Sequence, residues 1–172
     1  MSTIYEHTQK GNPLFYWGIP AFTLSAFIFA AAIIKATAGE KPIWTWSALG
    51  SLAPGFLIAM PTTIWAGLLM SRLTVTIDKE WIRVRFGFGT WRKKFAIDQI
   101  QSAAAVRNAW LMGWGIHWVG NGWLYNIAGF DSVELTLKNG KKARIGTDEP
   151  EKLVAAIQNG INSDEKFSRN VQ

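Results

Sequence analysis

Residues 83–94 hold five basic side chains and no acidic one, and they could bind an anion. Guanidinium and ammonium groups form charge-assisted hydrogen bonds with phosphate and carboxylate oxygens. Beside a membrane, each such residue is attracted to anionic lipid by about 1 kcal/mol. The segment predicts either a lipid- or partner-binding surface or a solvated strand face, and the two interpretations carry equal weight. The basic residues are Arg83, Arg85, Arg92, Lys93 and Lys94.

A second candidate surface is rich in tryptophan and glycine and covers residues 107–123. Tryptophan favours the headgroup level of a bilayer, where its ring is apolar and its N–H stays hydrated. We therefore predict that residues 110–114 form a tip that inserts into lipid, with core packing as the alternative. Trp118 and Trp123 are expected in the core. The candidate lipid- or partner-binding residues of this segment are Arg107, Trp110 and Trp114.

The sequence gives little support for metal binding or catalysis. His117 is a lone histidine without a cluster of cysteine, histidine or carboxylate ligands, so it predicts a strand residue with a hydrogen-bonded ring rather than a metal site. Asp148, Glu149 and Glu151 fit the start of a helix, where negative charge is favourable. No nucleophile elbow or phosphate-binding glycine loop is evident, and the chain has no cysteine. We expect no catalytic residue, metal or cofactor, and hence a protein that is not an enzyme.

Two long uncharged stretches precede both candidate binding surfaces in the sequence. Residues 14–34 and 43–71 contain no charged residue and no histidine. About 20 apolar residues in a helix cross the hydrocarbon layer of a bilayer. We therefore predict a transmembrane hairpin at residues 14–71, with spans at about 14–34 and 46–70. Spans without ionisable side chains argue against a transporter or a channel.

The distribution of basic residues predicts the orientation of this hairpin. Arg72, Lys79, Arg83 and Arg85 follow the second stretch, whereas the loop between the stretches balances two lysines against Glu40. Basic residues near span ends tend to remain cytoplasmic. We expect a multi-pass membrane protein with both termini in the cytoplasm.

From residue 73 onward, apolar residues alternate with polar ones, as in half-buried antiparallel strands. Asn139-Gly140 is typical of a tight hairpin between two such strands. Val133, Leu135 and Leu137 are predicted to point inward, with Glu134 on the outer face. A helix should follow, capped by Asp148 and ending near Asn159-Gly160. The further inward positions are Leu73, Val75, Ile77, Ile82, Val84, Phe86, Phe95, Ile97, Ala143 and Ile145.

These patterns divide the chain into four parts. Residues 1–13 are expected to be a cytoplasmic N-terminal tail, residues 14–71 the hairpin, residues 72–161 one cytoplasmic domain, and residues 162–172 a flexible tail. The fold class is α+β, with a bent antiparallel sheet or barrel closed by a C-terminal helix.

Several runs in this domain carry a resemblance to a known family. They are Gly115-Ile116-His117-Trp118, Gly122-Trp123-Leu124-Tyr125-Asn126 and Ile145-Gly146-Thr147-Asp148-Glu149-Pro150. Together with two preceding spans, residues 73–160 resemble the bacterial pleckstrin-homology-like (PH-like) domains of small membrane proteins. The resemblance implies a bent antiparallel sheet or barrel capped by a helix, in the bacterial inner membrane. It implies little chemistry, and phosphoinositide binding is not carried over.

The sequence thus favours a non-catalytic binding or scaffolding protein at the cytoplasmic membrane surface. Its expected partners are the bilayer and either anionic headgroups or another membrane protein, and a homo-oligomer is allowed. The alternative is a subunit of an enzyme or transport complex that acts on lipid at the interface. A sequence pI of 9.7 would permit nucleic-acid binding, but no recognition motif accompanies it.

Overall fold

The computed structural model describes residues 3–37 and 46–170 of the 172-residue chain. The chain divides into two compact units. One unit is the continuous segment Pro13–Leu69, and the other combines the chain before that segment with the chain after it. The first unit is therefore inserted into the sequence of the second.

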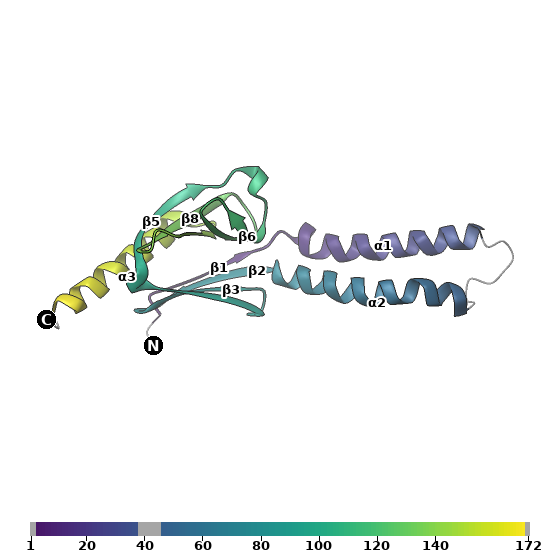
Figure 1. Cartoon of the computed structure of the whole chain (residues 1–172), viewed down its shortest axis with the longest axis horizontal. Helices are drawn as coiled ribbons and strands as arrows, with labels where there is room; N and C mark the ends of the chain where they lie inside the picture. Colours follow the sequence, from purple (N-terminus) through teal and green to yellow (C-terminus); the bar gives the residue numbers. More distant parts are fainter. Residues whose placement is uncertain (1–2, 38–45, 171–172) are drawn as a thin grey trace. The chain divides into compact units, whose positions relative to one another are not determined.

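The inserted unit is a pair of helices, α1 (Pro13–Thr37) and α2 (Trp46–Leu69), which lie side by side in Figure 1. They approach closely at Gly67, where an added Cβ would lie 2.5 Å from the backbone oxygen of Tyr16. Further along the pair, the rings of Phe27 and Phe56 meet edge to face with centroids 5.0 Å apart. Small residues thus permit backbone contact and aromatic rings fill the space beyond.

Among the described residues, one helix is long and apolar enough to cross a membrane, at Tyr16–Ala36. Only 6% of its apolar window is buried among the described residues. The apolar part of α2, Ala53–Leu69, is shorter. The two expected helices are therefore present, and crossing by both stays a prediction. Glu40 and Lys41, which entered the orientation argument, lie outside the described residues.

The second unit begins with a four-stranded antiparallel sheet in the order β1-β2-β3-β4. Three of these strands, β1, β2 and β3, are labelled in Figure 1. Its strands are β1 (Tyr5–Lys10), β2 (Arg72–Ile77), β3 (Trp81–Phe86) and β4 (Trp91–Ala96). The predicted inward positions of β2 and β3 are confirmed, since Leu73, Val75, Ile77, Ile82, Val84 and Phe86 are all buried. In β2 the intervening Thr74 and Thr76 are buried as well.

Strand β1 corrects the expectation of an N-terminal tail at residues 1–13. It pairs with β2 from Tyr5 opposite Ile77 to Lys10 opposite Arg72. Its inward residues, Tyr5, His7 and Gln9, carry polar atoms, so the segment lacks the hydrophobic alternation that reveals a strand. Its partner strand, β2, also follows both helices in the sequence, so the pairing cannot be recognised from neighbouring residues.

The ends of β1 and β2 that flank the inserted segment are joined within the second unit. The Gly11 N–H donates to the Ser71 oxygen at 2.9 Å. A Cβ added at Gly11 would lie 1.9 Å from the Met70 oxygen, so only glycine fits there. The close contact of Gly11 with Met70 and Ser71 therefore extends the pairing of β1 and β2 by one residue on each strand.

A second, five-stranded sheet has the order β5-β8-β9-β7-β6. Its strands are β5 (Ile100–Arg107), β6 (Gly115–Val119), β7 (Gly122–Asn126), β8 (Asp131–Leu137) and β9 (Lys142–Gly146). The short 3-10 helices η1 (Ile97–Gln99) and η2 (Trp110–Met112) flank β5.

The expected antiparallel barrel is wrong in two respects. The strands form two separate sheets, so no barrel closes, and β7 runs parallel to β9. This pairing puts the β6–β7 hairpin at the edge of the second sheet. Gly122 permits it, because a Cβ there would lie 1.9 Å from the Lys142 oxygen. The coarser prediction of an α+β domain is confirmed.

Helix α3 (Pro150–Asn170) packs on β5, β8 and η1 through buried residues that include Leu153 and Ile157. The predicted stop at Asn159-Gly160 is wrong, because the helix continues to Asn170 and includes the first residues of the predicted tail. Gly160 is buried inside the helix, where a Cβ would lie 3.1 Å from the Cδ1 atom of Ile97. Close packing therefore explains this glycine.

Candidate anion-binding site

Four of the five predicted basic residues of segment 83–94 share one face of the first sheet. Arg83 is paired with Lys94, and Arg85 with Arg92, across β3 and β4. Residues directly opposite on antiparallel strands project to the same side. Lys93 is opposite the buried Val84 and hence projects to the other side, where its Nζ lies 5.9 Å from the centroid of the Phe95 ring.

The same face continues onto β1 and β2. Thr74 is opposite Arg85, and Thr8 is opposite Thr74. Together with the loop between β3 and β4, these strands line a cavity of about 310 Å³, here named the arginine cavity. Its lining residues are Glu6, Thr8, Arg72, Thr74, Arg85, Gly87, Phe88, Gly89 and Arg92.

The side chains of the arginine cavity are held in place by local contacts. The guanidinium carbon of Arg72 lies 4.1 Å from the centroid of the Phe88 ring. The Nε of Arg92 donates to the Gly89 oxygen at 2.9 Å. Gly89 adopts a φ of 90°, which an L side chain rarely allows, so the loop conformation depends on this glycine.

Arg85, the third arginine of the cavity, is positioned by residues of β1 and β2. The Nη2 of Arg85 donates to the Thr76 hydroxyl at 3.4 Å and lies 3.6 Å from Oε1 of Glu6. The hydroxyls of Thr8 and Thr74 are 2.9 Å apart. Arg72 was not among the predicted binding residues. It directly precedes the clear alternation of β2, and extending that alternation back by one position would have placed it on this face.

Arg83 has a different role, although it shares the face. It forms an ion pair with Asp78, whose side chain is only 7% exposed. Burial raises the pKa of Asp78, but the backbone N–H groups of Glu80 and Trp81 and the charge of Arg83 outweigh it, so the net pKa is lowered. Arg83 therefore neutralises a buried carboxylate within the turn.

The predicted aromatic tip divides into two parts. Trp110 and Leu111 on η2 are 74% and 77% exposed. In contrast, the Nε1 of Trp114 donates to the Gly129 oxygen at 3.1 Å, and its ring lies 6.3 Å from that of Phe130. The exposed tip therefore contains Trp110 and Leu111, whereas Trp114 is held against the domain.

The expectation that Trp118 and Trp123 are in the core is wrong. They are 56% and 45% exposed and pack on each other edge to face, with centroids 5.8 Å apart. Trp118 lies on β6, the edge strand of the second sheet, and Trp123 lies opposite it on β7. Arg107 is exposed at the end of β5 in that sheet and does not line the arginine cavity.

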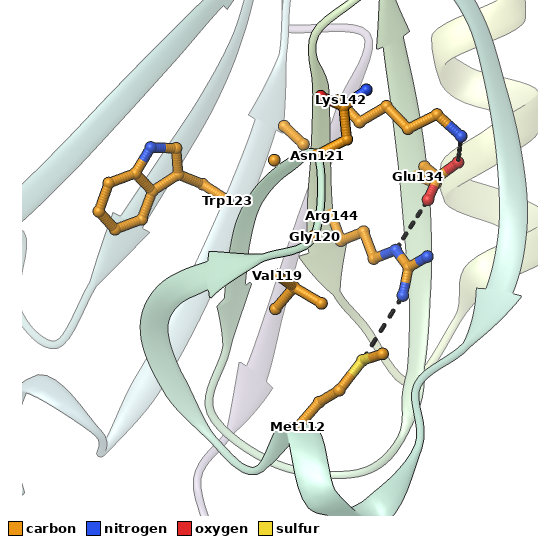
Figure 2. A pocket seen from close by; sticks show the side chains of 10 residues that line it. Met112, Val119, Gly120, Asn121, Trp123, Glu134, Lys142 and Arg144 are labelled. Carbon is orange, nitrogen blue, oxygen red and sulfur yellow. Dashed lines mark hydrogen bonds and ion pairs between the residues drawn. The ribbon is translucent and has the colours of Figure 1, made fainter.

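A second cavity of about 420 Å³ lies on the second sheet and is shown in Figure 2. Glu134 accepts hydrogen bonds from Nζ of Lys142 at 2.7 Å and from Nε of Arg144 at 2.8 Å. These bonds, the one from Lys142 foremost, hold the pKa of Glu134 below its usual range. The two cations of this cavity thus already share a carboxylate, which makes it a weaker anion site than the arginine cavity.

His117 is a strand residue in β6, as predicted, but its ring is not satisfied. Its buried Nε2 has no hydrogen-bond partner among the described residues. The part of the chain that the structure describes also contains no group of three or more potential metal ligands.

No family model matches this chain, and no curated protein matches it in sequence. The resemblance to PH-like domains thus stays a prediction from the residues that carry it.

Proposed function

We propose that this chain is a membrane-anchored, non-catalytic binding protein whose basic sheet face engages anionic groups at the cytoplasmic surface of the membrane. The observation that carries the proposal is the gathering of Arg72, Arg85, Arg92 and Lys94 on one face of the first sheet. Cations clustered on one face raise the local concentration of anions more than the same charges dispersed.

The apolar surface of the helix pair supports the anchor. Large apolar side chains of α1 and α2 are exposed, and water would be a poor solvent for so many of them. They include Trp17, Phe22, Ile28, Phe29, Leu57, Ile58 and Trp65.

The strand pairing supports two crossings rather than one. Strand β1 precedes α1, strand β2 follows α2, and the two strands are paired along their length. One folded sheet cannot lie on both sides of a bilayer. If α1 crosses the membrane, the chain must therefore return through α2 before β2 forms.

The binding proposal is tested on the full chain in a nonionic detergent, by titration with phosphatidylglycerol or phosphatidylcholine at low salt. We expect a preference for phosphatidylglycerol that weakens as salt rises, because exposed charges are screened. The double variant Arg92→Gln/Lys94→Gln should reduce this preference, by up to roughly fivefold per charge. A matched control, Lys138→Gln/Lys141→Gln, removes two exposed charges from the turn before β9.

Equal losses in the two double variants would show that only net charge matters, and would contradict a role for the sheet face.

The anchor is tested separately with topology reporters. A reporter after Gln172 should be cytoplasmic, and one between Gly39 and Glu40 should be external. An external signal from the C-terminal fusion would overturn the orientation.

A further inference from the structure

We propose that the arginine cavity binds one phosphomonoester group, either on a lipid headgroup or on a small soluble molecule. This inference rests on the proposed function, because it names the ligand class of the same sheet face. It goes further in requiring a defined site instead of a diffuse attraction.

The charges that line the cavity match a dianion. Arg72, Arg85 and Arg92 contribute three positive charges and Glu6 one negative charge, which leaves a net charge of +2. A phosphomonoester carries a charge of about −1.5 to −2 at neutral pH. A phosphodiester carries about −1 and would leave one guanidinium without a counter-charge.

The donors also suit a tetrahedral oxyanion. A guanidinium can give two parallel hydrogen bonds to a phosphate, and prior fixing of the side chain reduces the entropy lost on binding. Arg72 is fixed by its stacking on Phe88, and Arg92 by its bond to the Gly89 oxygen. The loop at residues 87–90 thus prepares two of the three arginines before a ligand arrives.

The hydroxyl pair adds a further donor. Because Thr8 and Thr74 lie 2.9 Å apart, one hydroxyl donates to the other. The accepting hydroxyl keeps its own proton, which it can donate to a phosphate oxygen. A cavity of about 310 Å³ also leaves space for the group that the phosphate esterifies.

The carboxylate of Glu6 lines this anion site and competes for Arg85. Its carboxylate lies 3.6 Å from Nη2 of Arg85, which is longer than the ~2.7–2.9 Å of a direct charge-assisted hydrogen bond. Its side chain is 54% exposed, so it can swing away from the arginine. A phosphate that bonds Arg85 directly would therefore replace a weak contact with a stronger one.

The test uses the full chain in nonionic detergent and glycerol 3-phosphate as the soluble probe, with affinities measured by titration calorimetry. Phosphatidate and phosphatidylglycerol in mixed micelles form the lipid arms. Arg85→Gln and Arg92→Gln should each weaken glycerol 3-phosphate binding about tenfold or more, the usual loss for a hydrogen bond to a charged group. Lys94→Gln, on the same face but outside the cavity, should change it less than about threefold.

Glu6→Gln is the complementary variant, because it should improve binding. Removal of the competing carboxylate should strengthen glycerol 3-phosphate binding about threefold or more, an effect that misfolding cannot imitate. The matched control is Glu80→Gln, which removes an exposed carboxylate in the turn before β3 and outside the cavity. Similar gains in both variants would mean that only net charge is sensed.

The outcomes separate this inference from the proposed function. Binding of glycerol 3-phosphate with a preference for phosphatidate over phosphatidylglycerol supports a lipid phosphomonoester. Binding of glycerol 3-phosphate without that preference supports a soluble ligand. Phosphatidylglycerol binding without glycerol 3-phosphate binding, and with equal losses in Arg92→Gln and Lys94→Gln, overturns the phosphate site and leaves the proposed function intact. Absence of binding in every arm overturns both.

Discussion

The imidazole Nε2 of His7 lies 2.6 Å from Oδ1 of Asp148, a residue 141 positions away along the chain. The Nδ1 of the same ring lies 3.5 Å from Oε2 of Glu149. The N-terminal strand is thereby attached to the segment that begins α3. Burial, and then the charges of Glu149 and Asp148, raise the pKa of the neighbouring Tyr5 to about 12. The hydroxyl of Tyr5 therefore keeps its proton to a higher pH than that of an exposed tyrosine.

The first prediction concerns this link. His7→Ala should lower the free energy of unfolding by about 1 kcal/mol, the typical net value of one hydrogen bond. It should also increase hydrogen exchange of the β1 amides. Lys10→Ala, at an exposed position of the same strand, serves as the control and should have little effect. Unchanged exchange of β1 in His7→Ala would contradict the proposed attachment.

The second prediction concerns removal of the helices. Because Lys10 and Arg72 are paired, a two-residue Gly-Ser link from Asn12 to Met70 should join β1 to β2. The resulting chain, residues 3–12 linked to 70–172, should be soluble and should unfold cooperatively. The fragment 73–172 lacks β1 and exposes the edge of β2, so it should melt at a lower temperature or aggregate. Identical melting of the two proteins would show that β1 adds no stability.

The third prediction concerns acid stability. The pKa of Glu134 is lowered in the folded protein, so its contribution is fully present above its unfolded pKa of about 4.3 and is lost as the pH falls through the folded value. Glu134→Gln should therefore reduce stability at neutral pH by about 1–3 kcal/mol, and the difference from the unaltered chain should shrink below about pH 4. Denaturant unfolding between pH 7 and pH 3 measures this. A difference that is constant with pH would mean that its ion pairs do not contribute.

The fourth prediction concerns the core register of β8. Leu135 is completely buried, so Leu135→Asp would place an unpaired charge in the core and should cost more than about 4 kcal/mol. Ser102→Asp, at an exposed position of the neighbouring β5, should cost less than about 1 kcal/mol. Glu134→Lys is not a mild control, since it would set a third cation beside Lys142 and Arg144. Equal melting temperatures of Leu135→Asp and Ser102→Asp would show that the register is wrong.

The fifth prediction concerns the exposed aromatic tip. The chain has no cysteine, so Leu111→Cys introduces a single labelling site. The emission of a polarity-sensitive fluorophore at this position should lie further to the blue when the full chain is in lipid nanodiscs than when it is in lipid-free amphipol. The same label at Gln101, an exposed position of β5, should shift less. A label at Leu111 that remains as hydrated as the one at Gln101 would contradict insertion of the tip.

The sequence by itself determined the elements whose signal is local. Hydrophobic alternation identified β2, β3, β8 and β9, and the buried Leu135 and Ile145 confirm that register. The period of two survives because each of these strands directs its large apolar side chains to one face. Two uncharged stretches likewise revealed α1 and α2. The basic character of residues 83–94 was also visible, because charge is a property of the residues themselves.

Only the tertiary structure decided which residues act together. Strand β1 was concealed because its inward positions are polar and its partner lies beyond two helices. The strands form two sheets instead of a barrel, β7 pairs parallel to β9, and the rings of Trp118 and Trp123 are exposed instead of buried in a core. Arg72, Arg85 and Arg92 meet in one cavity because strand register, not spacing along the chain, brings side chains to a common face. Non-local pairing is fixed by the whole set of contacts, and no short sequence window contains that information.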